Sequence, residues 1–507
     1  MLIALLAVLG AAGCAAITPR RDRAVAGDLV RAPIDIPVVR VGGVRSVNAI
    51  PPGFVGFSIE DTAVLSYASE NGRDPVFLQL VRNLNPGQSP VLRFGGDSTD
   101  WSWVPVPGMR RPGGVTYAIT PVWLRAVRAL THALHARVIF GINLEAGNTA
   151  VAAAEGKAFV DAVGVSSVKA LEIGNEPELY GIVGWYAAPN GAPVFGRLKS
   201  YDIADYAAQL VAFAKVLPGV PLAGPATGAS GWIARLPELL GAVPYLRLVT
   251  VHRYPLARCT SAPGSPTYPT LHNLMSPRSS AGLAHSVARA VAVAHAHGAE
   301  LRIDEINSVS CRGERGLSNT FASALWVLAA LFRMASADVD GVNIQSVPQS
   351  VYPPFSVREV GHERRWVVNP LYYGLLMFAQ AAPPHSRLLA VSGTVARRVR
   401  TWATRSPSGQ TRVVFINESR RRSKYVKVEV PGTRSAATLT VLRAPSMTAR
   451  SGVTLGGQTF GRETSTGRLV GRRHLLAVAS VKGVYVLKLP PASAAMLTVP
   501  ARTRKSR

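Results

Sequence analysis

The stretch "LEIGNEPELY" at positions 171–180 carries three carboxylates, and "LRIDEINSVSC" at 301–311 carries two more. Cleavage of a glycosidic bond needs two carboxyl groups that flank the bond. One group protonates the leaving oxygen, while the other attacks the anomeric carbon or activates a water molecule. The two stretches supply side chains for this chemistry if the fold brings one acid from each into a common pocket.

The elements that would carry these acids follow a repeated pattern. From about position 50 to 380, short apolar runs alternate with longer helical patterns, which predicts βα units and a parallel sheet. The predicted strands are 54–59, 91–94, 137–142, 170–174, 221–224, 248–251, 301–304 and 341–345. Eight such units fit an α/β fold of the (β/α)8 TIM barrel type. A doubly wound open sheet is the competing topology, but no Gly-rich nucleotide loop follows the first strand.

The pattern changes after about position 383, where apolar and polar residues alternate with a period of two. In "YVKVEV" at 425–430, for example, the valines share one face, which predicts a C-terminal antiparallel β-sandwich domain. The strand-like segment 32–49 is expected to join that domain. The predicted organisation is an export signal at 1–16, a linker and N-terminal strand at 17–49, the barrel at 50–382, the β-sandwich at 383–500 and a basic tail at 501–507.

Active sites of TIM barrels lie at the carboxyl ends of the strands, and this rule separates the five acids. Glu176 lies just beyond strand four, whereas Glu172 lies deeper within that strand and Glu178 lies further out in the loop. On strand seven, Glu305 has the parity of the inward-facing apolar residues and Asp304 has the opposite parity. Glu176 and Glu305 are therefore predicted to stand opposite each other across the barrel mouth.

Four motifs occur in the order that a known family shows. Gly-Asn-Glu-Pro after strand four, His-x-Tyr in "VHRYP" after strand six and a Glu after strand seven resemble the clan of retaining barrel glycosidases. Within that clan, "VLRFGGDSTDW" and "GFSIE" resemble glycoside hydrolase family 79, the β-glucuronidase and heparanase-like family. The likeness runs from about Pro51 to the carboxyl terminus and includes the accessory β-domain of that family.

The resemblance implies roles for the residues at the strand ends. Glu176 would be the acid/base and Glu305 the nucleophile of a retaining β-glycosidase. Asn175 would bond the sugar 2-hydroxyl, and Tyr254 would hold an oxygen of the nucleophile. Taken singly, Glu176 could instead cap the next helix and Glu305 could pair with an Arg, but the ordered set of motifs favours catalysis.

Further site residues rest on the same resemblance. Glu60 and Asp97 match positions at which the family contacts sugar hydroxyls, although an Asx-turn would also explain Asp97. Tyr372 in "NPLYYG" matches a tyrosine that the family uses on the carboxylate of a uronate. His252 is interpreted as a structural histidine.

The loop after the nucleophile departs from the family pattern. Uronate-cleaving members carry Tyr-Gly-Gly there, whereas this chain has Ser310-Cys311-Arg312. Arg312 could supply a guanidinium fork to a carboxylate, or it could face solvent. Cys311 and Cys259 are candidates for a disulfide, since strands six and seven are neighbours in a barrel.

Three functions therefore stay open. The first is a β-glucuronidase-like enzyme that acts on glycans or glycosides. The second keeps the mechanism but acts on a neutral sugar, such as a β-glucoside, β-xyloside or β-galactoside. The third is a non-catalytic envelope protein that binds acidic polysaccharide, and its expected mark would be the loss of one acid. No cofactor and no metal is expected.

The composition describes a globular protein with a strong positive charge. Hydrophobic residues make up 48% and charged residues 17%, while 56 Lys and Arg against 29 Asp and Glu give a net charge of +27. This charge favours acidic polysaccharides or other polyanions as partners besides the carbohydrate substrate. No motif of a nucleic-acid reader is present, so no specific nucleic-acid partner is expected.

The amino terminus predicts export. "MLIALLAVLGAAGCAAITPRRDR" is apolar through Ile17 and then basic, and it is shorter than the ~20 residues that span a bilayer. Ala-Ala-Gly before Cys14 resembles a bacterial lipobox, which would attach a lipidated Cys14 to a membrane, although ordinary signal cleavage is the alternative. The expected location is extracellular or on the outer face of a bacterial membrane, an oxidising setting in which Cys259 and Cys311 would be bridged.

Overall fold

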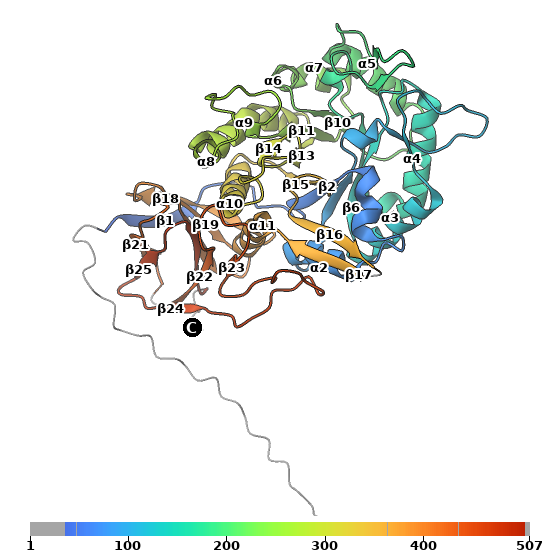
Figure 1. Cartoon of the computed structure of the whole chain (residues 1–507). Helices are drawn as coiled ribbons and strands as arrows, with labels where there is room; N and C mark the ends of the chain where they lie inside the picture. The colour runs from blue at the N-terminus through green and yellow to red at the C-terminus, as the bar shows by residue number, and fades with distance from the viewer. Residues whose placement is uncertain (1–35, 47, 362, 434, 502–507) are drawn as a thin grey trace, which may run out of the picture. The chain divides into compact units, whose positions relative to one another are not determined.

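The computed structural model of the protein describes residues 36–46, 48–361, 363–433 and 435–501, which form a barrel and a β-domain (Figure 1). The predicted export signal, the lipidation candidate Cys14, most of the linker and nearly all of the basic tail lie outside these residues. No helix in the described ranges is long and apolar enough to cross a membrane.

Eight parallel strands close into a barrel in the order in which they occur along the chain. They are β2 (Val55–Ile59), β3 (Val91–Phe94), β6 (Arg137–Ile142), β7 (Val168–Ile173), β10 (Leu222–Thr227), β11 (Leu248–Arg253), β13 (Glu300–Ile306) and β15 (Gly341–Ser346). Strand β15 pairs with β2 and thereby completes the ring. The predicted TIM barrel is confirmed, and each predicted strand overlaps an observed one.

Helices cover the outside of the barrel. The main ones are α1 (Val64–Ala68), α2 (Pro75–Leu84), α3 (Pro121–Leu134), α4 (Thr149–Val163), α5 (Ile203–Ala214), α6 (Ser230–Ala234), α7 (Leu236–Ala242), α8 (Leu271–Leu274), α9 (Ala281–Ala296), α10 (Phe321–Ser336) and α11 (Pro370–Ala381). Local signals set their starts: the Thr120 side chain accepts from Trp123 N at 3.2 Å, and Asp202 and Asp205 form a capping box.

The interior of the barrel is polar at two levels. Near the amino ends of the strands, buried Arg302 donates to Asn343 and to the carbonyl of Gly53. Near the carboxyl ends, buried Arg93 meets a group of acids. A buried charge is stable only beside charged or hydrogen-bonding partners, so each of these two arginines requires polar side chains around it inside the barrel.

Short two-stranded sheets lie in the loops outside the barrel. They are β4 (Ser102–Trp103) with β5 (Tyr117–Ala118), β8 (Tyr186–Ala187) with β9 (Pro193–Val194), β12 (Leu256–Ala257) with β14 (Val309–Ser310), and β16 (Phe355–Val360) with β17 (Glu363–Val368). The β12–β14 pair joins the loops that follow β11 and β13, which are the loops nearest to Glu305.

The β-domain contains one sheet of ten strands, nine of them on one hydrogen-bonded path and the tenth, β24, paired with β22 beside it. They are β1 (Val38–Val44), β18 (Arg387–Gly393), β19 (Val399–Arg405), β20 (Thr411–Asn417), β21 (Lys424–Glu429), β22 (Ala437–Arg443), β23 (Thr454–Leu455), β24 (Leu476–Val478), β25 (Val484–Leu489) and β26 (Ser493–Val499). Apolar residues from both halves of this path, among them Val428, Leu487 and Phe415, share one core.

The N-terminal strand joins this domain, as the sequence predicted. It pairs antiparallel with β18 and parallel with β21, so one pairing differs from the antiparallel pattern expected for the whole domain. Because β1 comes from the other end of the chain, it can enter between β18 and β21 in a direction that no hairpin would impose.

Candidate active site

The end of β7 presents Glu176 in an unusual backbone conformation. Glu176 has φ 47° and ψ 52°, which is the left-handed region that residues other than Gly seldom adopt. Its N–H donates to the carbonyl of Ala226, at the end of β10, at 3.0 Å. The side chain is half-buried. Such strain at a strand end is typical of functional sites, since the surrounding structure must hold it.

The end of β13 presents Glu305, whose two oxygens are held by different donors. The Tyr254 hydroxyl donates to Oε1 at 2.8 Å, and Arg93 Nη1 donates to Oε2 at 3.2 Å. The Glu305 side chain is only 12% exposed. These contacts fix the orientation of the carboxylate.

His252, at the end of β11, connects the two acids. Its Nδ1 lies 2.8 Å from Glu176 Oε1 and 3.9 Å from Glu305 Oε2, and its Nε2 lies 3.6 Å from Asp304. Burial by itself lowers the pKa of His252, but the charges of Glu305 and Asp304 outweigh it and raise that pKa well above its usual value. His252 is therefore a cation among acids, not a neutral core histidine.

Arg93 on β3 is the second cation of the site, and it is fully buried. Its Nε lies 2.6 Å from Glu172 and 3.1 Å from Asp304, in addition to the contact with Glu305. Burial raises the pKa of Glu172 to about 8, while the charges of Arg93 and His252 outweigh burial at Asp304 and lower its pKa to about 2. Glu172 thus keeps a proton at neutral pH and can share it with Asp304.

Asn175 precedes the acid and is oriented by the same arginine. Arg93 Nη2 donates to Asn175 Oδ1 at 2.9 Å, which directs the amide nitrogen the other way. Among the described residues, that nitrogen has no hydrogen-bond partner and is available to a ligand. The Asn175 N–H is held by Asp100 at 3.2 Å and by Tyr180 at 3.1 Å.

Glu60 and Asp97 lie beside this cluster in different ways. Glu60 is buried and accepts from Ser98 N, Ser98 Oγ and Gln345 Nε2 at 2.8, 2.6 and 2.9 Å. Burial and the charge of Asp97 raise its pKa to about 8. Asp97 reaches solvent, yet the protein atoms that crowd its carboxylate and the charges of Glu305 and Glu176 raise its pKa to about 7. Asp97 is thus placed to meet a ligand, whereas Glu60 supports the loop behind it.

The rim of the site is built from the loops after β11 and β13. The structure joins Cys259 and Cys311 in a disulfide, next to the β12–β14 pairing. Cys311 and Arg312 have φ values of 60° and 70°, so two residues other than Gly occupy left-handed conformations in succession. Arg312 is exposed at this rim, and its charge lowers the pKa of Asp97.

The prediction for Tyr372 is wrong. Tyr372 lies in α11, fully buried, and its hydroxyl donates to the carbonyl of Leu80 at 2.7 Å. Its ring packs against the ring of Phe460. The tyrosine that the structure does bring to the site is Tyr352, after β15, whose ring lies 6.4 Å from that of Tyr254. Burial and the charge of Glu305 raise the pKa of Tyr352 well above its usual value.

The two other acids of "LEIGNEPELY" are scaffold. Glu172 is bound to Arg93 inside the barrel, and Glu178 accepts from Gly228 N at 2.7 Å and from Ala229 N at 3.0 Å. Glu178 therefore ties the loop after β7 to the loop after β10. Glu176 is the member of the three that stands beside Glu305.

Arg93, His252 and Tyr352 were missed as site residues. Arg93 carried a usable signal, because a charged residue inside a four-residue apolar strand must have buried partners. Tyr352 lies in the irregular loop "SVPQSVYPP", where no periodicity predicts which side chain faces the barrel. In the part of the chain that the structure places, no three His, Cys, Asp or Glu side chains are grouped to hold a metal ion.

Comparisons with known proteins bear on the fold and on the C-terminal domain. Residues 401–496 match the model of the glycosyl hydrolase family 79 C-terminal beta domain. A 4-O-α-L-rhamnosyl-β-D-glucuronidase from Fusarium oxysporum 12S, solved with Rha-GlcA, is 19% identical with a TM-score of 0.71 and covers 91% of this chain and 100% of its own. A family 51 arabinofuranosidase from Xanthomonas axonopodis pv. citri is 14% identical with a TM-score of 0.62, over 91% and 99% of the two chains.

A family 30 endoxylanase from Clostridium papyrosolvens C71 is 12% identical with a TM-score of 0.53, over 92% and 100% of the two chains. No curated protein sequence matches the chain. At these identities the solved structures show the shared fold. Together with the C-terminal domain, they confirm the resemblance to glycoside hydrolase family 79 and support a glycoside hydrolase as the general class of the protein.

Proposed function

We propose that the protein is a retaining glycoside hydrolase that cleaves β-glycosidic bonds, with Glu176 as acid/base and Glu305 as nucleophile. The observation that carries this proposal is the shared contact with His252 Nδ1, 2.8 Å from one acid and 3.9 Å from the other. Two carboxyls that reach the same ring nitrogen support the short separation of roughly 5–5.5 Å used for retention over the roughly 6.5–9.5 Å used for inversion.

The proposed reaction has two steps. Glu305 attacks the anomeric carbon while Glu176 gives its proton to the glycosidic oxygen, so the bond to the leaving group breaks and an ester between the sugar and Glu305 forms. Glu176 then takes a proton from water, whose oxygen attacks the same carbon and releases Glu305. Tyr254 and Arg93 hold the two oxygens of Glu305 in place for the first attack.

A β-glucuronide or a related uronide is the proposed substrate class. Cys311 and Arg312 keep the left-handed backbone that a Gly-Gly pair would adopt without strain, so the N–H groups of this loop can still face an anion. The Arg312 guanidinium, which acts on Asp97, supports a second contact to a sugar carboxylate. A neutral sugar is the alternative, favoured by Ser310, which takes the place of the family's tyrosine.

A panel of aryl β-glycosides that includes the glucuronide tests the assignment. We expect Glu305→Gln to reduce the turnover of every active substrate by about 10³-fold or more. Glu176→Gln should impair substrates with poor leaving groups most, since good leaving groups need little protonation. Glu300→Gln is the matched control, because Glu300 lies on the same strand but at its opposite, exposed end.

Three outcomes would contradict parts of the proposal. Undiminished activity of either Gln variant would refute the roles of the acids. If NMR shows that the first sugar product has the opposite anomeric configuration to the substrate, retention would be refuted. A wild-type preference for a neutral sugar would move the substrate class to the alternative. Wild type that turns over no β-glycoside but binds acidic polysaccharide would favour a non-catalytic envelope protein.

A further inference from the structure

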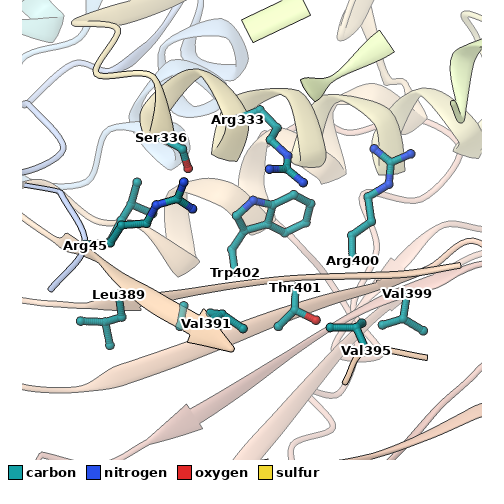
Figure 2. A pocket seen from close by; sticks show the side chains of 12 residues that line it. Arg45, Arg333, Ser336, Leu389, Val391, Val395, Val399, Arg400, Thr401 and Trp402 are labelled. Carbon is teal, nitrogen blue, oxygen red and sulfur yellow. The ribbon is translucent and has the colours of Figure 1, made fainter. Parts of the chain in front are cut away.

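A second candidate site lies where the barrel meets the β-domain. A cavity of about 300 Å³ is bounded by the last turns of α10 on one side and by strands β18 and β19 on the other. Figure 2 shows Arg333 reaching from α10 onto the ring of Trp402, while Arg45 points into the same space from the segment after β1. The cavity is as large as the smaller ligand sites of proteins.

This cavity is far from the acids along the barrel. Helix α10 follows β13 and runs back toward the start of β15, so Arg333 and Ser336 lie near its end. Shortly after the helix, Asp340 N donates to the carbonyl of Leu301 at 2.9 Å, at the beginning of β13. Glu305 lies toward the other end of that strand. The cavity therefore belongs to the opposite end of the barrel from the proposed catalytic pair.

Three guanidinium groups line the cavity, but only one has a carboxylate partner. Arg400 pairs with Glu418 at 2.5 Å and also donates to Ser280 and to the carbonyl of Met275. Arg333 and Arg45 form no ion pair and no side-chain hydrogen bond with any residue that the structure describes. The guanidinium of Arg333 lies over Trp402, 5.6 Å from the ring centre, which fixes its direction.

Nearby acids do not neutralise these two cations. Glu418 is engaged by Arg400, and Asp338 accepts from Ser46 Oγ at 2.8 Å and lines a separate cavity. Burial lowers the pKa of Arg333, and the like charges of Arg400 and Arg45 lower it further. Two uncompensated guanidinium groups that face one cavity repel each other, and a bound anion would remove that repulsion.

Two polar atoms at the cavity are also left without partners. Arg333 Nε and Thr401 Oγ1 are both buried, and neither has a hydrogen-bond partner in the described structure. A buried donor without an acceptor is costly, so such groups usually mark a missing partner. Arg333 Nε lies on the side of Trp402 and Arg400, whereas Thr401 stands between these two residues on β19 and points to the opposite face of the strand (Figure 2).

We propose that this cavity is a binding site for an oxyanion of the carboxylate, sulfate or phosphate type, held by Arg333 and Arg45. The two guanidinium groups donate to its oxygens. The ring of Trp402 is already engaged by Arg333 and by the stacked ring of Phe332, whose centre lies 5.2 Å away. The site therefore recognises the charged group itself and not a sugar ring by stacking. It does not depend on the catalytic assignment.

Isothermal titration calorimetry on the full chain tests the site. Sodium sulfate, sodium phosphate and sodium glucuronate are each titrated against sodium chloride of equal ionic strength. We expect saturable binding of sulfate at one site per chain. Arg333→Gln or Arg45→Gln should weaken it about tenfold or more, since each removes a charged donor. Arg289→Gln, an exposed arginine on α9, is the matched control and should change it less than about twofold.

The arms of the experiment separate the sources of the anion. If the cavity variants also weaken the binding of glucuronate, the site takes the acidic group of a saccharide. If they affect sulfate and phosphate alone, it takes free inorganic anions. Binding of none of the three probes to the wild type, or equal binding by both cavity variants, would overturn the proposal. Arg45 is exposed, so Arg45→Gln should fold even if Arg333→Gln does not, and it should keep the hydrolytic activity of the wild type.

Discussion

The interior of the candidate active site and its rim are built in different ways. In the interior, residues on strands have several partners each: Arg93 alone contacts Glu172, Asp304 and Glu305. At the rim, Cys311 and Arg312 are exposed, lie on a loop and are held by a disulfide and a two-residue strand pairing. Under the proposed function, the residues at the strand ends perform the catalytic steps, and the loop after β13 selects the sugar.

Removal of Arg93 should have the largest effect and tests the interior. Arg93→Met keeps much of the side-chain volume but leaves the acids around it without their cation. We expect a loss of about 3–5 kcal/mol in the free energy of unfolding and a loss of about 10²-fold or more in kcat/KM. Urea unfolding and steady-state kinetics with an aryl glycoside measure the two.

Arg235→Met is the matched control for that experiment. Arg235 also contacts two acids, Asp202 and Glu238, but all three side chains are well exposed to solvent. Solvent weakens such pairs, so we expect little change in stability or activity. Equal effects of the two substitutions would show that burial does not distinguish the interior network.

Opening the disulfide should have a smaller effect and tests the rim. With a sequence separation of 52 between the cysteines, the double change Cys259→Ala and Cys311→Ala should cost about 2–4 kcal/mol of unfolding free energy. We expect KM to rise, because the loop with two left-handed residues is no longer held, while kcat stays within about threefold. Reductant should reproduce this in the wild type and leave the variant unaffected. A fall in kcat as large as that caused by Arg93→Met would contradict these separate roles of the strand residues and the loop.

The interior was partly predictable from the sequence, because residues at the carboxyl ends of the strands face the site, and this rule singled out Glu176 and Glu305. The parity prediction for Asp304 was wrong. Asp304 lies 3.1 Å from Arg93 and 3.6 Å from His252, in the same cluster as Glu305, because the register of β13 shifts between Ile303 and Glu305. The contacts between strands were not predictable. That His252 touches Glu176 and that Arg93 reaches across to β7 and β13 depends on the closure of the barrel and not on any local pattern.

The rim and the late loops were predicted less well. Tyr372 was assigned to the site from a short motif, but α11 turns it into the core, where its hydroxyl meets a backbone carbonyl. Tyr352 takes its place from a loop without periodicity. The Cys259–Cys311 pair could be expected because neighbouring strands bring their loops together, whereas the left-handed backbone at Cys311 and Arg312 follows only from the structure.

A change of pH should have a still smaller effect on the free energy of unfolding, and it tests the buried groups of the interior. The pKa values of Glu60 and Glu172, raised to about 8 from an ordinary 4.5, mean that the folded state keeps protons that the unfolded state releases. The raised pKa of His252 acts in the same direction. The free energy of unfolding should therefore fall as pH rises from about 5 to 8, by about 2 kcal/mol or more.

Urea unfolding at constant ionic strength measures this slope. Glu60→Gln should flatten it, because it removes one of the titrating groups, while Glu300→Gln at the exposed start of β13 should leave it unchanged. Stability that stays constant or rises over this range would show that these acids are ionised in the folded protein.

Substitution of Arg312 should have the smallest effect, because it changes only a side chain at the rim. Arg312→Gln removes the guanidinium that lowers the pKa of Asp97, so that pKa should rise above about 7. If an ionised Asp97 holds sugar hydroxyls, the acidic limb of kcat/KM should move to higher pH. We also expect KM for an aryl glucuronide to rise about tenfold with little change in kcat, because one charged contact is lost. KM for a neutral aryl glycoside should not change, and an equal rise for both substrates would mean that Arg312 shapes the rim without reading the carboxylate.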